Sequence, residues 1–98
     1  MVQINWTLQA TSDLKDIAEY ISKDSKKYAK LQIVRIRFRT RILTSQLYSG
    51  KIVMEIGKNN IRELIEGNYR IIYKVVNDSR VDILTIHHSA RDLFRRNI

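Results

Sequence analysis

Hydrophobic and polar residues alternate along this chain with two periods, one typical of β-strands and one typical of α-helices. From Val2 to Trp6 the apolar residues occupy every second position, which predicts a half-buried first strand. Thr7 is a suitable N-cap for the helix that follows, and Asp13 falls off the apolar stripe of that helix. The stripe comprises Ala10, Leu14, Ile17, Ala18 and Ile21.

A second helix is predicted to begin near Lys26, because Asp24 and Ser25 are turn and capping residues. We expect it to end at Ser49 and Gly50, and to pack antiparallel to the first helix because the connection is short. Its stripe at helical spacing is the face that we expect to be buried. This stripe comprises Leu31, Val34, Phe38 and Ile42, with Leu47 one turn beyond.

The C-terminal half of the chain returns to strand-like patterns separated by turn residues. A short strand at Ile52 to Met54 and a loop at Gly57 to Asn60 precede three longer strands. These are Ile61 to Glu66, Tyr69 to Val76 and Arg80 to His88, joined by turns at Gly67-Asn68 and Asn77-Asp78-Ser79. Strands grouped after helices are typical of an α+β fold. We predict the order β-α-α-β-β-β, with the two-helix hairpin packed on a twisted antiparallel sheet and a short helical tail from Ala90 to Ile98.

Length and composition set the class of protein. A chain of 98 residues with 44% hydrophobic residues predicts one domain over residues 1–98. No window approaches the roughly 20 consecutive apolar residues of a membrane span, and the N-terminus lacks the pattern of a secretory signal. Without cysteine and with only two histidines, the chain offers no expected metal site. We therefore expect a cytoplasmic protein without membrane span, metal or cofactor.

The formal net charge is +8, and the basic residues are concentrated in one part of the chain. No acidic residue lies between Asp24 and Glu55. That interval contains Lys26, Lys27, Lys30, Arg35, Arg37, Arg39, Arg41 and Lys51. Such a block favours a polyanion or an acidic protein as partner, although Lys and Arg are also common on solvated helix faces. Charge alone does not separate nucleic acid from an acidic protein partner.

Arg70 is the most unusual residue of the C-terminal strands, because it is a cation within an aromatic and β-branched segment. A three-residue turn after its strand would pair Lys74 with Asp82 and place Arg70 opposite Ile86. His88 would then lie diagonally beside Arg70 on the same face. A two-residue turn would bring the preceding histidine there instead.

A face with Arg70, Lys74 and one histidine, bordered by Tyr69 and Arg91, has the groups needed to bind phosphate and transfer a proton. The alternative for Arg70 is a structural one, since a cation on a half-buried strand needs a carboxylate, water or a ligand. The carboxylates available for such a salt bridge are Glu55, Glu63 and Asp92.

An ordered set of motifs along nearly the whole chain resembles the RelE/ParE family of bacterial toxins. The motifs are Trp6, Ala10, Asp13-Leu14, Ile17, Tyr20-Ile21, Gly50, Arg62-Glu63-Leu64, the run from Gly67 to Tyr73, Ile83-Leu84, His88 and Ala90-Arg91. The resemblance implies a helical hairpin on an antiparallel sheet. It also implies a cognate antitoxin as partner in a toxin–antitoxin hetero-oligomer.

The resemblance leaves two targets open. RelE-like members cut mRNA on the ribosome, and in that branch Arg70 matches the arginine that contacts the scissile phosphate, while His88 matches a catalytic histidine. ParE-like members inhibit DNA gyrase. Ser89 stands where the nuclease members carry a tyrosine, and the ending from His87 to Leu93 looks more like ParE-type sequences. Leu47 and Tyr48 stand where the family commonly has a proline.

A ParE-like gyrase inhibitor is therefore the favoured interpretation, and an mRNA endoribonuclease with Arg70 and His88 as catalytic residues is the alternative. A third hypothesis is a nucleic-acid-binding module that uses the basic second helix. The candidate binding residues are Arg62, Tyr69, Lys74, Arg91, Arg37 and Arg41.

Overall fold

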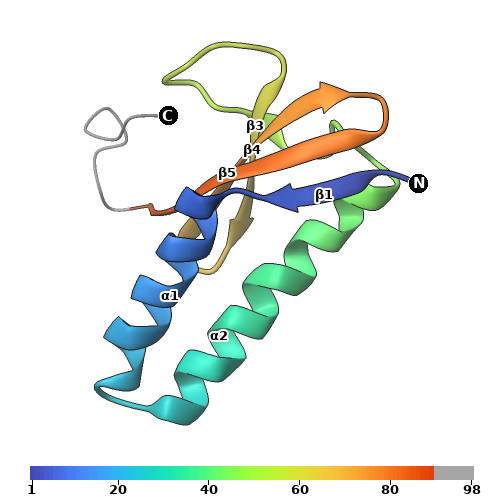
Figure 1. Ribbon diagram of the computed structural model, residues 1–98. Helices are drawn as coiled ribbons and strands as arrows, with labels where there is room; N and C mark the ends of the chain where they lie inside the picture. Colours follow the sequence, from blue (N-terminus) through green and yellow to red (C-terminus); the bar gives the residue numbers. More distant parts are fainter. Residues whose placement is uncertain (90–98) are drawn as a thin grey trace.

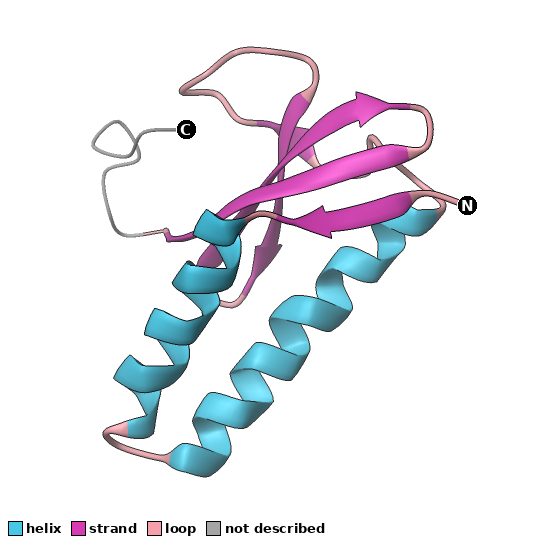
Figure 2. Ribbon diagram, viewed as in Figure 1, coloured by secondary structure: helices cyan, strands magenta, loops and turns pink. Residues whose placement is uncertain are grey.

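The structure, a computed structural model, describes residues 1–89 and consists of a two-helix hairpin beneath a five-stranded sheet (Figure 1). The elements are β1 (Gln3–Trp6), α1 (Leu8–Ser22), α2 (Lys26–Arg39), a 3-10 helix η1 (Thr40–Thr44), β2 (Lys51–Ile52), β3 (Ile61–Glu66), β4 (Tyr69–Asn77) and β5 (Arg80–His88). Figure 2 shows both helices below the strands, with the α1–α2 turn far from the sheet. The fold is α+β as predicted, while the predicted tail from Ala90 to Ile98 lies outside the described residues.

The strand order in the sheet is β1-β5-β4-β3-β2. The meander of β3, β4 and β5 is antiparallel as predicted, and β2 pairs antiparallel with β3. β1 joins the open edge of β5 in parallel, from Gln3 opposite Arg80 to Trp6 opposite Ile83. The predicted antiparallel sheet therefore holds for β2 to β5, whereas the parallel edge strand β1 makes the sheet mixed; the apolar pattern of an edge strand fixes its faces but not its direction.

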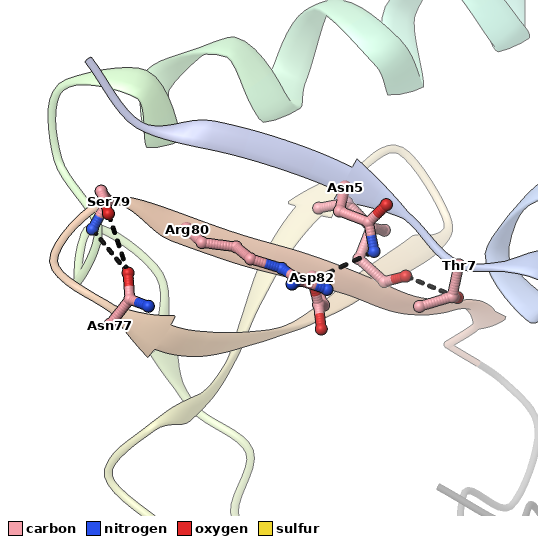
Figure 3. Close-up of polar contacts among 7 residues, drawn as sticks. Asn5, Thr7, Asn77, Ser79, Arg80 and Asp82 are labelled. Carbon is pink, nitrogen blue, oxygen red and sulfur yellow. Dashed lines mark hydrogen bonds and ion pairs between the residues drawn. The ribbon is translucent and has the colours of Figure 1, made fainter.

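Polar side chains join β1 to β5 (Figure 3). The Asn5 amide donates to Asp82 over 3.1 Å, and Arg80 Nε donates to the same carboxylate oxygen over 2.9 Å. The Thr7 hydroxyl donates to the Ile83 carbonyl over 2.7 Å and accepts from the backbone N–H of the first turn of α1. Thr7 is thus the predicted N-cap, and it also ends the pairing of β1 with β5.

Asp13 completes the hydrogen bonding of β5 beyond the end of β1. Its carboxylate accepts from the backbone N–H of Ile86 over 3.0 Å and from the Thr85 hydroxyl. Gln9 Nε2 also donates to it over 2.8 Å. The sequence interpretation placed Asp13 off the buried stripe, and this was wrong: the residue is 7% exposed. A buried carboxylate is tolerated here because it accepts hydrogen bonds that no neighbouring strand could accept.

The main core lies between the helices and one face of the sheet. Its buried members are Ala10, Leu14, Ile36, Leu43, Leu64, Ile71, Tyr73, Val75, Val81, Ile83 and Ile86. A smaller cluster comprises Val53, Ile61 and Ile72, with Ile56 and Leu84 packed against it. Because Ile72 alternates with Ile71 and Tyr73 along β4, the smaller cluster lies on the opposite face of the sheet.

The predicted buried face of α2 was wrong. The residues of α2 and η1 that are buried are Ala29, Gln32, Ile36, Thr40 and Leu43. The predicted stripe of Leu31, Val34, Phe38 and Ile42 is instead exposed. Helix α2 has apolar residues on two faces. The face whose residues are smaller and more polar packs inward, where α1 comes close. Leu47 does pack against the main core, although α2 ends at Arg39 and η1 continues to Thr44 rather than to Ser49.

Gly50 allows the chain to pass tightly over Tyr73. The buried Tyr73 hydroxyl donates to the Leu47 carbonyl over 2.9 Å and accepts from the Gly50 N–H over 3.0 Å. A Cβ atom at Gly50 would lie 2.5 Å from the Glu63 carbonyl oxygen. Burial raises the pKa of Tyr73, which keeps the hydroxyl protonated and able to donate.

Candidate functional site

Arg70 lies on β4 on the face of the sheet opposite the helices, between Ile65 of β3 and His87 of β5. The predicted register of Lys74 opposite Asp82 is confirmed. The predicted pairing of Arg70 with Ile86 was wrong, because the register shifts near Ile72 and Tyr73 and leaves Leu84 without a paired residue. This bulge brings His87 opposite Arg70, and His88, which was predicted to lie diagonally beside Arg70, lies opposite Tyr69 instead.

The guanidinium of Arg70 is held by two carboxylates. Its Nη1 and Nη2 atoms contact the two carboxylate oxygens of Glu55 at 2.6 and 2.9 Å, in a bidentate pair. Its Nε donates to Glu63 Oε2 over 2.6 Å. Only 13% of the Arg70 side chain and 6% of the Glu63 side chain are exposed. The expected open cationic pocket at Arg70 is therefore wrong, and the structural alternative of a salt bridge describes this residue.

The electrostatics of this ion-pair cluster follow from its composition. Hydrogen bonds from Arg70 lower the pKa of Glu55 from 4.5 to about 2. The same pair, led by the hydrogen bond to Glu55, raises the pKa of Arg70. Two ionised carboxylates and one guanidinium carry a net charge of about −1, which disfavours an approaching phosphate. The cluster instead ties the connection between β2 and β3, which contains Glu55, to β4.

The two histidines occupy different environments at the end of β5. His87 is buried on the Arg70 side, with 1% of its surface exposed. His88 lies opposite Tyr69 on the neighbouring strand, and the two rings meet edge to face with centroids 5.4 Å apart. Tyr69 also packs against the main core. His88, the candidate catalytic histidine, is thus placed beside an aromatic ring rather than beside the arginine.

Arg62 holds two loops together. Its Nη1 donates to the Gly50 carbonyl over 2.8 Å, and its Nε donates to the Asn59 carbonyl over 2.9 Å. The guanidinium also lies over the Tyr48 ring, 4.9 Å from its centroid. These contacts give a predicted binding residue a structural function in the turns that flank β2.

The remaining candidate cations lie on the surface. Lys74 is exposed on β4, on the sheet face opposite the helices. Arg37 and Arg41 are exposed on α2 and η1, where Arg37 lies over the Trp6 ring at 5.1 Å and Arg41 lies over the Phe38 ring at 5.6 Å. Arg91 is outside the described residues. The structure thus spreads the described candidates over three surfaces rather than one groove: Arg37 and Arg41 on the hairpin side, Arg70 and Lys74 on the far face of the sheet, and Arg62, Tyr69 and His88 on the face toward the helices.

Within residues 1–89, no group of three or more His, Asp or Glu side chains could hold a metal ion. None of the helices in that part of the chain is long and apolar enough to cross a membrane.

Comparisons with known proteins give one family match and one similar fold. A family model described as the ParE toxin of the type II toxin–antitoxin system parDE matches residues 4–93. A solved structure described as the chromosomal ParDE TA system from P. aeruginosa superposes with a TM-score of 0.72 and 20% sequence identity. The match covers 90% of this chain and 96% of that chain, and at this identity it supports the fold alone. A comparison with curated proteins gave no match.

Proposed function

Since the chain belongs to the ParE toxin family of type II toxin–antitoxin systems, we propose that it inhibits DNA gyrase and is held inactive by a cognate antitoxin. The observation that carries this proposal is the ParE match over residues 4–93, which includes both the hairpin and the sheet. The sequence motifs left two targets open, gyrase and ribosome-bound mRNA. The family-model match favours the ParE branch, and with it gyrase.

The ion-pair cluster at Arg70 also supports gyrase rather than mRNA as the target. A ribonuclease arginine must present its N–H groups to the scissile phosphate in the transition state. Here the Nε, Nη1 and Nη2 atoms of Arg70 already donate to Glu55 and Glu63. The candidate proton-transfer residue, His88, is paired with Tyr69 across the strands instead. These contacts support a target other than a scissile phosphate.

The charge of the chain fits an acidic antitoxin, which is the kind of partner that the family match indicates. A net charge of +8, with no acidic residue between Asp24 and Glu55, favours an acidic or amphipathic segment that covers the basic protein. A segment that folds on binding would bury a large surface and neutralise this charge in the same step. We expect the partner to be encoded beside the gene for this chain.

The test compares both targets with the same purified protein. We expect the protein to block supercoiling by DNA gyrase, and we expect ribosome-bound mRNA to remain intact. The protein encoded by the neighbouring short reading frame should relieve both the gyrase block and the growth arrest. Cleavage of mRNA in the ribosomal A site, lost on Arg70→Lys or His88→Ala, would overturn the proposal in favour of the endoribonuclease. Salt-sensitive binding to free duplex DNA without growth arrest would favour a nucleic-acid-binding module.

A further inference from the structure

One side of the second helix carries a row of exposed cations. Lys26, Lys30 and Arg37 lie on α2, and Arg41 lies on η1, which continues it. They are separated by four, seven and four residues, and these spacings place side chains on the same side of a helix. All four residues are exposed. We refer to these four residues as the cationic flank.

The cationic flank has a continuous helical support. Figure 1 shows α2 as one helix that extends from the α1–α2 turn to the sheet. Arg37 lies over the Trp6 ring, 5.1 Å from its centroid, and Arg41 lies over the Phe38 ring at 5.6 Å. An aromatic face attracts a guanidinium without using its N–H donors. The two arginines are therefore positioned at the surface with their donors directed to other partners.

The chain itself supplies no anion to the cationic flank. Within residues 1–89 the salt bridges involve Arg70 and Arg80, and none involves this row. The exposed acids of the hairpin, Asp16, Glu19 and Asp24, belong to α1 and to the turn that follows it. The row is thus a line of uncompensated positive charge, which attracts a polyanion.

The spacing of the charges fits the two backbones of a DNA duplex. Lys26 and Lys30 form one pair, and Arg37 and Arg41 form a second pair eleven residues further along the chain. At 1.5 Å per residue the two pairs lie roughly 16 Å apart. The major groove of B-DNA is about 12 Å wide, so each pair can reach a different backbone across it. Arginine also presents a planar fork that suits phosphate oxygens.

We propose that the cationic flank binds the phosphate backbones of duplex DNA, with its lysine pair and its arginine pair on opposite sides of one groove. The inference rests on the proposed function, because gyrase acts on duplex DNA and an inhibitor of gyrase meets that polymer at its target. Contacts to phosphate carry no sequence information, so duplexes of unrelated sequence bind alike.

Duplex RNA fits the cationic flank less well. The major groove of an A-form helix is deep and narrow, so its two backbones are not spaced for two pairs of cations about 16 Å apart. A row that follows only total negative charge would bind both polymers equally. Comparison of DNA with RNA of the same sequence therefore tests the geometry as well as the charge.

Fluorescence anisotropy of the purified protein with a labelled duplex of about 20 base pairs measures the contact. Four neutralised phosphates predict a slope of about −3.6 for log K against log salt, which is a loss of about 150-fold between 50 and 200 mM KCl. The double variant Lys30→Gln, Arg37→Gln should show a slope of about −1.8 and a loss of about 12-fold. Arg37→Lys keeps the charge and should keep the wild-type slope.

The matched control removes the same charge elsewhere. Lys51 lies on β2 and Lys58 in the connection that follows, and both are exposed. The double variant Lys51→Gln, Lys58→Gln should therefore retain a slope close to −3.6. All the substituted residues are exposed, so the thermal unfolding midpoints should stay within a few degrees of the wild type.

Three results would overturn the inference: no binding of duplex DNA at 50 mM KCl, a control slope reduced as much as that of Lys30→Gln, Arg37→Gln, or binding of duplex RNA as tight as that of DNA. A wild-type protein that blocks supercoiling without binding free duplex would refute the DNA contact and leave the proposed function intact. Binding through the cationic flank without a gyrase block would support the inference and contradict the proposed function instead.

Discussion

Replacing Glu55 by glutamine tests the electrostatic description of the Arg70 cluster directly. The substitution keeps the size of the side chain and removes the charge that contacts the two terminal nitrogens of Arg70. Arg70 keeps its second carboxylate, Glu63, so the guanidinium is not left without a partner. The change therefore isolates the contribution of the link between the β2–β3 connection and β4.

The expected magnitude follows from the pKa of Glu55. A decrease from 4.5 to about 2 corresponds to about 3.5 kcal/mol, at roughly 1.4 kcal/mol for each pKa unit. A quarter of the Glu55 side chain is exposed (25%), and solvent screening lowers the contribution of such a pair. We expect Glu55→Gln to reduce the free energy of unfolding by about 1–2 kcal/mol at pH 7.

The dependence on pH has a definite sign. Because the pKa of Glu55 is lower in the folded protein than in the unfolded chain, the ion pair stabilises the fold fully above pH 4.5. This stabilisation is lost as the pH falls from 4.5 through about 2, where Glu55 becomes protonated in the folded state as well. Urea unfolding of the wild type and Glu55→Gln at pH 7, 4 and 2 should therefore show a difference that decreases toward the lowest pH.

A matched control removes an exposed carboxylate elsewhere. Glu19→Gln, on the exposed surface of α1, should change the free energy of unfolding by less than about 0.5 kcal/mol at each pH. Equal stability of the wild type and Glu55→Gln at pH 7 would refute the reasoning. So would a difference that persists unchanged to pH 2, because it could not arise from the ionised carboxylate.

Two further substitutions test contacts that define the fold. Gly50→Ala should lower the free energy of unfolding by about 2–3 kcal/mol, because its Cβ would lie 2.5 Å from the Glu63 carbonyl oxygen; an unchanged urea midpoint would contradict the close approach. Asp13→Ala should cost about 2–3 kcal/mol by leaving the buried Ile86 N–H unpaired. In the same assay, Asp13→Asn should cost less because it keeps an acceptor, and the exposed Asp16→Ala should cost less than about 0.5 kcal/mol.

The features that were predicted from the sequence are those set by local interactions. The caps Thr7 and Ser25 accept from the first turns of their helices, as their side-chain chemistry predicts. The bounds of the three long strands follow from alternating residues and from the turn at Gly67, where the positive φ of 58° favours glycine. The pairing of Lys74 with Asp82 also followed from local charge complementarity.

The features that were missed depend on how distant segments pack. The bulge at Leu84 moved His87 opposite Arg70, and no short-range pattern specifies such an extra residue. The buried face of α2 was missed because its residues are less hydrophobic than those of the exposed stripe. The buried residues of the helix are Ala29, Gln32 and Ile36, and the exposed stripe comprises Leu31, Val34, Phe38 and Ile42. The basic residues could have identified the exposed face of α2. If Val34 and Phe38 were buried, Arg35 would also lie close to the core, and that interval has no acidic residue to pair with it.

The location of Arg70 changes where recognition by this protein should be sought. A phosphate ligand would have to compete with Glu55 and Glu63 for a guanidinium whose three nitrogens already donate to carboxylates, and it would do so against a net charge of about −1. Within residues 1–89 no salt bridge engages the cations of α2, and the interval that contains them has no acid of its own. On electrostatic grounds we therefore expect an acidic partner to approach the hairpin rather than the Arg70 cluster.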